Sequence, residues 1–304
     1  MRHLKNKQLS LLLFIIISYF VQAQSLDELM AASEKPKTEY TIGTFKGTKI
    51  LNSQSVEGVG KGVLQVMFQH RFGTLFNGAY DFFGLDNAGI RFGFDYGITN
   101  RLTIGVGRSG GGVEPNGQKA YDGYFKLKLL RQSSGEKVMP FSVSLFASTA
   151  IKSSNNFDET DKLPYRLFYT GQLIIARKFS NSFSAQIMPT VVHRNLTDTP
   201  EDKNTIFSMG MAARMKLTKR FGLIVEYYYN PVNQQDSKYY NHIAAFGLEI
   251  ETGGHVYHLL FTNGSGMIEH QFIGYNTFPI YQGAQSIRFG FNLSRVFTLI
   301  KYND

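Results

Sequence analysis

The sequence predicts an all-β protein: a single antiparallel transmembrane β-barrel of about twelve strands with short periplasmic turns and longer external loops. Three observations predict this fold. Apolar residues alternate with polar or small ones at a period of two through most of the chain, as in strands with unlike faces. The connections between these strands alternate between short and long. The amino terminus has the composition of a secretory signal peptide, so the mature chain is expected to be exported.

The predicted signal peptide covers residues 1–23. Basic residues precede the apolar run of residues 9–21. Val21 and Ala23 then occupy the −3 and −1 positions of a cleavage site before Gln24. This run is the only apolar stretch of helical length, so the mature chain has no candidate transmembrane helix.

Two further regions follow. Residues 24–61 form an N-terminal lead-in segment, which has partial alternation and could fold into the lumen as a plug or stay in the periplasm as a partner contact. Residues 62–304 form the β-barrel. The last strand must pair with the first, because an unpaired strand edge in hydrocarbon leaves backbone groups unsatisfied.

The alternation is clearest in residues 88–107. Ile90 and Phe94 share one face of a predicted strand, and Arg91 and Asp95 share the other, so the first pair is expected to face lipid and the second the lumen. The same pattern recurs in ten further predicted strands: 63–69, 121–130, 139–148, 166–176, 183–191, 207–217, 221–229, 242–250, 255–261 and 286–294.

The lengths of the connections distinguish a membrane barrel from a soluble β-sandwich. Short turns such as residues 97–100 and 218–220 alternate with long connections such as 71–86 and 263–284, which would place every long loop at one end. Aromatic residues agree with two interfacial girdles. Phe179, Phe183 and Phe221 lie beside short turns, and Tyr227, Tyr229 and Tyr240 lie beside a long loop.

Composition narrows the function classes. The chain of 304 residues has no cysteine, which excludes disulfides and cysteine-ligated metals, and it is rich in Gly (30), Phe (26) and Tyr (17). The formal net charge is +9, from 32 basic and 23 acidic residues. No basic cluster or nucleic-acid motif accompanies this charge, so no nucleic-acid partner is predicted.

No catalytic residue, cofactor site or metal site is predicted. The Gly-rich residues 107–117 lack the Lys and Ser/Thr of a phosphate-binding loop. His255 and His258 are three apart on a strand and therefore lie on opposite faces. His193, Asn195 and Ser208 are the nearest approach to a hydrolase constellation, and Asp158, Glu159 and Asp161 could bind calcium or form a solvated loop, which is the favoured interpretation.

The inward face, assigned by parity, carries an excess of basic residues. The candidate lumen-lining residues are Arg91, Asp95, Asp122, Lys126, Lys128, Arg166, Arg214, Lys216, Glu226, Glu249 and Arg288. They could line a path for solutes, or they could form ion pairs that fill a narrow barrel, because twelve strands lie between filled eight-stranded barrels and open sixteen-stranded porins.

Several stretches resemble a family of uncharacterised outer-membrane β-barrels of Bacteroidota, a domain of unknown function. They include "TFKGTKILNSQSVE", "KGVLQVMFQHRFG", "TGGHVYHLLFTNGSGMIE" and "IRFGFNLSRVF", and they extend from Thr44 to Phe297. The resemblance implies a β-barrel in the cell outer membrane of a Gram-negative bacterium. It transfers no functional residue.

These observations predict a non-enzymatic outer-membrane protein that passes or binds small polar solutes, with a basic excess that suggests anions. The alternative is a non-conducting barrel that acts as an anchor or partner of an outer-membrane assembly. The expected partners are outer-membrane lipid and lipopolysaccharide, the barrel-insertion machinery and a small solute. Any protein partner is unknown.

Overall fold

The computed structural model describes residues 37–111, 119–153, 162–197, 199–200, 202–231 and 241–302. Residues 40–133 and 139–302 belong to one compact unit, and residues 37–39 and 134–138 to another. The predicted signal peptide, Tyr240 and the candidate calcium residues Asp158, Glu159 and Asp161 lie outside the described residues.

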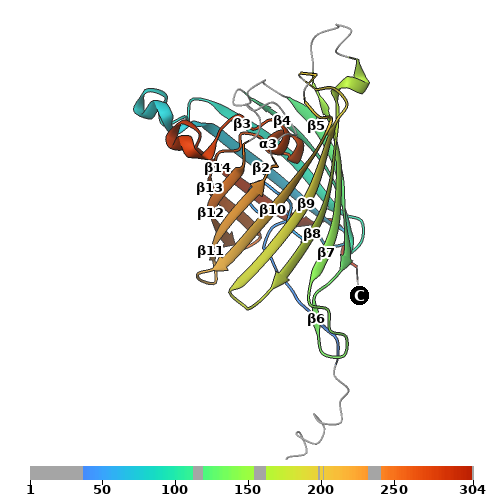
Figure 1. The fold of residues 1–304 in the computed structure, drawn as a ribbon. Helices are drawn as coiled ribbons and strands as arrows, with labels where there is room; N and C mark the ends of the chain where they lie inside the picture. The colour runs from blue at the N-terminus through green and yellow to red at the C-terminus, as the bar shows by residue number, and fades with distance from the viewer. Residues whose placement is uncertain are drawn as a thin grey trace, which may run out of the picture. The chain divides into compact units, whose positions relative to one another are not determined.

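Twelve strands form one closed antiparallel barrel, which confirms the predicted fold class (Figure 1). They are β2 (Val63–Thr74), β3 (Ala88–Gly97), β4 (Leu102–Gly111), β5 (Ala120–Leu130), β7 (Ser142–Lys152), β8 (Leu167–Lys178), β9 (Phe183–Arg194), β10 (Thr205–Lys216), β11 (Phe221–Tyr229), β12 (Ile243–Thr252), β13 (His255–Thr262) and β14 (Arg288–Thr298). The short strands β1 (Glu39–Tyr40) and β6 (Ser133–Ser134) are not part of the barrel.

The barrel closes where the last strand pairs with the first. β14 runs antiparallel to β2 with Leu293 opposite Phe68 and Thr298 opposite Val63. This seam leaves no open sheet edge, which is the condition for a sheet to span hydrocarbon.

The two faces of the wall have opposite character. Outward side chains such as Ile90, Val225 and Phe246 are exposed, whereas inward neighbours such as Gln69 and Arg91 are buried. Exposed apolar side chains are costly in water and favourable in lipid, so the outward face is the surface that meets the membrane. No helix among the described residues has the length and apolarity needed to cross a membrane.

Three of the short turns share one local device. In each, a hydroxyl accepts hydrogen bonds from the backbone N–H groups two and three residues later. The hydroxyls belong to Thr99, Ser180 and Thr218. Ser and Thr at this position satisfy turn amides that have no strand partner, so the turns stay short.

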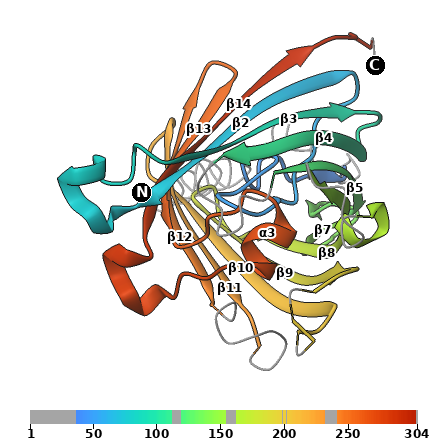
Figure 2. The same ribbon diagram turned by 90° about the horizontal axis from the view of Figure 1, so that it is seen from above.

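The long connections carry the helical turns. These are η1 (Leu75–Asp81), η3 (Leu163–Arg166), α3 (Glu269–Gly274) and η5 (Ile280–Gln285). Viewed from above, α3 lies inside the ring of strands, as does the blue chain that precedes β2 (Figure 2). The lumen of this barrel is therefore occupied by the chain itself.

Candidate functional site

The candidate site is the barrel lumen and the chain that fills it. We call residues 44–59 the interior segment and residues 263–276 the interior loop. Nearly all residues of the interior segment are buried, and all residues of the interior loop are. The interior segment contains no helix or strand, and its internal backbone pairing is confined to a turn closed by a bridge between Lys49 and Gln54. Its backbone groups therefore need partners on the wall, because a buried unpaired amide or carbonyl is costly.

Glu226 of β11 binds the amides of the interior segment. Its carboxylate accepts hydrogen bonds from the backbone N–H groups of Leu51, Asn52 and Ser53 at 3.2–3.3 Å and from the Ser53 hydroxyl at 2.8 Å. Hydrogen bonds to an ionised acceptor are stronger than those between neutral groups. One wall carboxylate therefore fixes the tip of the segment.

Lys126 of β5 binds the carbonyls of the same segment. Its ammonium donates to the backbone oxygens of Thr48 at 2.8 Å, Ser55 at 3.1 Å and Glu57 at 2.9 Å. An ammonium has three donors, and all three are used here. Strands β5 and β11 lie on opposite sides of the ring, so the segment is held across the lumen by two groups of opposite charge.

The barrel seam also holds the segment. Arg71 of β2 and Asn292 of β14 both donate to the Leu51 carbonyl, at 3.0 Å and 2.7 Å. Gln186 of β9 accepts from the Val56 N–H at 2.9 Å and donates to the Gln54 carbonyl at 2.8 Å. The wall thus supplies a donor or an acceptor at successive positions of the segment.

Apolar packing adds to these polar contacts. Ile50, Leu51 and Val56 of the segment are buried in one cluster with inward residues of the wall, among them Ile174 and Ile224. Full burial of each such side chain is worth about 1.5–3 kcal/mol relative to exposure. The parity analysis did not identify these inward apolar residues. Their signal is the consecutive apolar letters in "LIIA" and "GLIV", which interrupt strict alternation.

Two ion pairs lie within the wall itself. Arg91 of β3 donates to both carboxylate oxygens of Asp122 of β5, at 2.9 Å and 2.5 Å. Arg214 of β10 donates twice to Glu249 of β12, at 2.8 Å and 2.6 Å. In each pair the two partners lie on strands that are separated by one other strand, β4 in the first pair and β11 in the second. These four charges are neutralised without help from the interior segment.

The interior loop closes the lumen further. Lys49 of the interior segment donates to the Met267 carbonyl at 3.2 Å and lies 3.6 Å from the Glu269 carboxylate. Phe272 packs edge-on against Tyr228 of β11, with ring centroids 5.3 Å apart. The interior pocket beside Lys49 and Glu269 has a volume of only about 10 Å³, which is room for about one water molecule.

The interior loop carries a histidine whose charged form is disfavoured. His270 is stacked on Phe168 with ring centroids 4.4 Å apart. Burial lowers the pKa of His270 from 6.5 to about 3, with Arg194 acting in the same direction and Asp122 against it. Because the pKa is depressed in the folded state, the stability linked to neutral His270 is complete above pH 6.5 and is lost as the pH falls towards 3.

We therefore expect acid to loosen the interior loop. At pH 5 the linked loss is about 2 kcal/mol, so amide hydrogen exchange in residues 267–274, corrected for its intrinsic pH dependence, should speed up between pH 7.5 and pH 5. His270→Gln should abolish this difference. His193→Gln, a change at a ring that contacts Thr205 and Tyr169, should leave it intact. An equal pH response in all three proteins would assign the titration to another group.

The structure divides the predicted lumen residues into two groups by burial. Eight have buried side chains: Arg91, Asp95, Asp122, Lys126, Arg214, Glu226, Glu249 and Arg288. Of these, Asp95 accepts from the Thr48 hydroxyl at 3.2 Å, and Arg288 lies over the Phe278 ring at 4.2 Å. The other three are only half-buried. Lys128 faces the mouth described next, Arg166 ends η3 outside the strands, and Lys216 ends β10.

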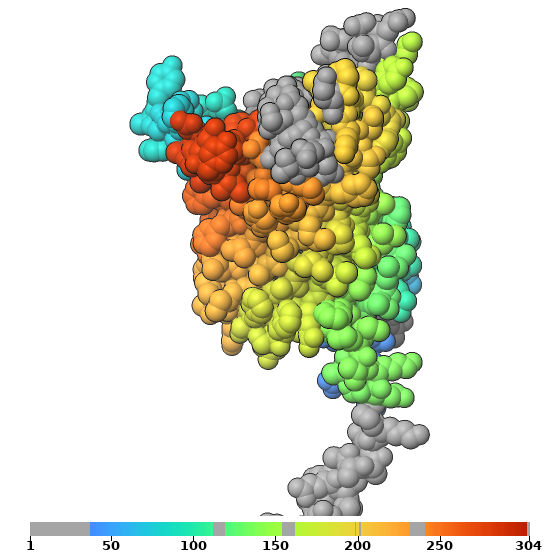
Figure 3. All heavy atoms as spheres, viewed as in Figure 1, coloured from blue at the N-terminus to red at the C-terminus, as the bar shows by residue number. Residues whose placement is uncertain are grey.

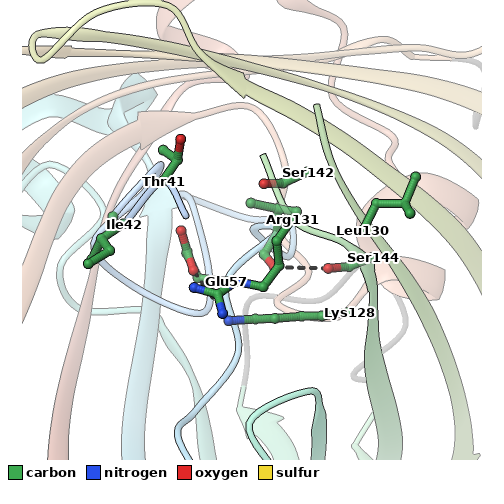
Figure 4. Close-up of a pocket in the computed structure, with 10 residues that line it drawn as sticks. Thr41, Ile42, Glu57, Lys128, Leu130, Arg131, Ser142 and Ser144 are labelled. Carbon is green, nitrogen blue, oxygen red and sulfur yellow. Dashed lines mark hydrogen bonds and ion pairs between the residues drawn. The ribbon is translucent and has the colours of Figure 1, made fainter. Parts of the chain in front are cut away.

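A pocket of about 150 Å³ remains at the mouth near the short turns (Figure 4). Glu57, Lys128 and Arg131 point towards the same space, and the Lys128 ammonium lies 3.5 Å from the Glu57 carboxylate. Ser144 donates to the Val56 carbonyl at 2.9 Å, which fixes the segment beside the pocket. The pocket is polar and is bounded on one side by the interior segment.

The candidate chemical motifs do not assemble. His258 is buried inside the barrel while His255 lies on the outward side beside Tyr257, as parity predicts. His193 bonds to Thr205, whereas Ser208 bonds to Asn230, so the hydrolase constellation is not formed. Most of the Gly-rich stretch 107–117 falls outside the described residues, and the part of the chain that is described contains no metal-binding group of three or more His, Cys, Asp or Glu residues.

Several solved structures of outer-membrane barrels align with this chain. Among solved structures, the KdgM porin aligns with a TM-score of 0.49 and 9% identity over 77% of this chain and 99% of that chain. The NanC porin gives 0.47 and 9% over 77% and 98%. Outer membrane phospholipase A from Escherichia coli gives 0.43 and 12% over 79% and 91%. These TM-scores are below 0.5, so no function is inferred from them.

A comparison with curated proteins gives no match. The family model described as a membrane bound beta barrel domain (DUF5777) matches residues 45–297. That match covers the interior segment from its second residue and the wall as far as the penultimate residue of β14. The chain therefore belongs to the family of membrane-bound β-barrel domains DUF5777.

Proposed function

We propose that this protein is a non-enzymatic outer-membrane β-barrel that is closed at rest and passes small polar solutes when the interior segment moves. One observation carries the proposal: residues 44–59 cross the lumen and are bound to the wall by the side chains of Glu226, Lys126, Arg71 and Gln186. A lumen filled in this way has no path for a solute unless the segment is displaced.

The chemistry of the wall supports passage once the segment has moved. The groups that bind the segment are carboxylate, ammonium, guanidinium and amide groups, which water or a polar solute can bind in its place. Outside the two wall ion pairs, the buried inward residues have a basic excess, and we propose that the solutes are anions for this reason. These residues are Arg71, Lys126, Arg194 and Arg288 against Asp95 and Glu226.

A second candidate function is a permanently closed barrel that anchors a partner. The apolar contacts of the segment favour it, because Phe45, Ile50 and Leu51 are packed as in a protein core. Displacing them would expose apolar surface inside the lumen and would therefore be costly. The two candidates predict different behaviour once the segment is removed.

The test is single-channel conductance in planar bilayers. The intact mature protein should be silent. A variant in which residues 44–59 are replaced by a Gly/Ser linker should give stable steps with an anion-selective reversal potential. Heat-modifiable mobility on gels establishes that both barrels are folded. Conduction by the intact protein would contradict closure at rest. A folded but silent linker variant would contradict passage by displacement of the interior segment and favour the anchor.

A further inference from the structure

Two long connections leave the wall sideways at the end of the barrel that carries the long loops. One contains η1 and the other contains η5. Figures 1 and 2 show both segments, cyan and red-orange, projecting away from the barrel axis, and Figure 3 shows them standing out from the wall. They adjoin each other, because the Leu75 N–H donates to the Ile287 carbonyl at 2.9 Å.

The two segments have the same local construction. Their sequences are "LFNGAYD" and "IYQGAQ", and each turn is broken at its glycine. Gly78 has φ 55° and ψ −129°, and Gly283 has φ 56° and ψ −123°, a conformation that is strained for a residue with a β-carbon. The aromatic residue two positions before the glycine is exposed in both segments, Phe76 at 59% and Tyr281 at 87%, and Tyr80, two positions after Gly78, is 91% exposed.

The exposed surface of these segments is rich in aromatic side chains, and it also carries the polar Asn77, Gln282 and Gln285 and the charged Asp86. Phe76, Phe82 and Phe83 are also exposed, and both Phe82 and Phe83 adopt left-handed backbone conformations. Residues 276–287 contain no charged residue. Asp81 of η1 is turned inward, where it accepts from the Asn77 amide at 3.0 Å and from the Gly84 N–H at 2.9 Å. Tyrosine and phenylalanine are typical of the boundary between membrane and water.

A cleft lies between η5 and the outward face of the wall. It is lined by Ile280 and Ile287 on one side and by Ala244, Phe246 and Phe261 of β12 and β13 on the other, and its volume is about 200 Å³. This is below the roughly 300 Å³ at which pockets for drug-sized ligands begin. The size and lining suit part of an alkyl chain.

The cleft is continuous with the surface that meets lipid. Phe261 packs against Phe289 of β14 with centroids 5.6 Å apart, and Phe289 stacks on Phe72 of β2 at 5.8 Å. These rings belong to the outward face of the wall. A ligand in the cleft would therefore extend from the bilayer without crossing a polar surface.

We propose that the η1 and η5 segments lie in the membrane interface and that the cleft under η5 binds an acyl chain of a membrane lipid. The overhang shields one side of the chain and the wall shields the other. Such a site would hold one lipid longer than the rest of the outward face does. The proposal depends on the barrel being in a membrane and does not depend on conduction through its lumen.

The absence of tryptophan from the chain permits a clean test of depth. Tyr281→Trp introduces a single indole on η5, and Tyr165→Trp introduces one on η3, where Lys162 and Arg166 flank an exposed ring. In vesicles of brominated phospholipid, emission from Tyr281→Trp should fall by about twofold or more, because indole at the interface reaches the chains. Emission from Tyr165→Trp should remain unquenched. Quenching of Tyr281→Trp by aqueous iodide alone would overturn the proposal and favour a surface for a protein partner.

A second measurement tests the cleft itself. Ala244→Phe fills the cleft from an outward position, so it leaves the lumen unchanged. Ala213→Phe makes the same change on β10, elsewhere on the outward face. Native mass spectrometry of protein extracted in mild detergent should show a retained lipid on the unaltered protein and on Ala213→Phe, and none on Ala244→Phe. Equal lipid retention by both variants, or none by the unaltered protein, would contradict a specific site.

Discussion

Glu226→Gln should open the lumen. The carboxylate accepts hydrogen bonds from four donors in residues 51–53, and a glutamine amide at the same place presents N–H groups to some of these donors. We expect a loss of about 3 kcal/mol in the binding of the segment, which corresponds to a roughly 100-fold rise in the population with the segment displaced. Channel steps in planar bilayers and faster amide exchange in residues 48–56 would report it.

Glu249→Gln is the matched control. Glu249 is also a buried carboxylate, on the strand next to Glu226, but it is bound by Arg214 and lies 3.5 Å from His258, which are wall residues. Its replacement should lower the stability of the barrel and leave the lumen silent. If both variants conducted equally, the opening would come from a general weakening of the wall, and Glu226 would have no special role in closure.

Asp122→Asn should cause the largest loss of stability. It leaves the Arg91 guanidinium buried without its ionised partner, which costs about 3–5 kcal/mol. Arg91 cannot move aside easily. Gln69 accepts a hydrogen bond from one of its nitrogens at 3.1 Å, and its guanidinium is packed so closely on Gly107 that a side chain at that position would overlap it. Urea unfolding in lipid vesicles measures the change.

The double variant Arg91→Met with Asp122→Leu is the control for this prediction. Replacing both partners by apolar side chains removes the unpaired charge as well as the pair, so most of the loss should be recovered. A double variant as unstable as Asp122→Asn would show that the pair is needed for packing, not only for neutralisation. Neither result would bear on conduction, which depends on the interior segment.

The outward face of this barrel could be predicted from the sequence, and a plug formed by residues 24–61 is one of the two predicted alternatives for that segment. The contacts that hold residues 44–59 in the lumen could not be predicted. Period-two alternation depends only on the geometry of a strand, so it predicts that residues such as Ile90 and Phe94 lie on the outward face, where the structure places them. The seam between β14 and β2 followed from the cost of an open edge. Both arguments use local pattern and a general property of the bilayer.

The interior contacts depend on distances in sequence that no local pattern encodes. Arg91 and Asp122 are 31 residues apart and meet only because the registers of β3, β4 and β5 bring them together. The interior segment has weak alternation because it is not a strand, and its amides bind Glu226, 173–175 residues away. Parity could place a charge on the inward face, but it could not identify the partner of that charge.

The position of the interior segment at the seam has a consequence for biogenesis. The Leu51 carbonyl is bound by Arg71 on the first strand and by Asn292 on the last strand, and Asn292 lies 241 residues after Leu51. Contacts of such high contact order form late, because a long loop must close before they contribute. The arrival of the final strand therefore closes the ring and adds the Asn292 contact to those that β2, β5, β9 and β11 make with the interior segment. In an assembly intermediate that lacks β14, the interior segment would be bound less tightly. Closure of the seam would then tighten the contacts in the lumen at the same time.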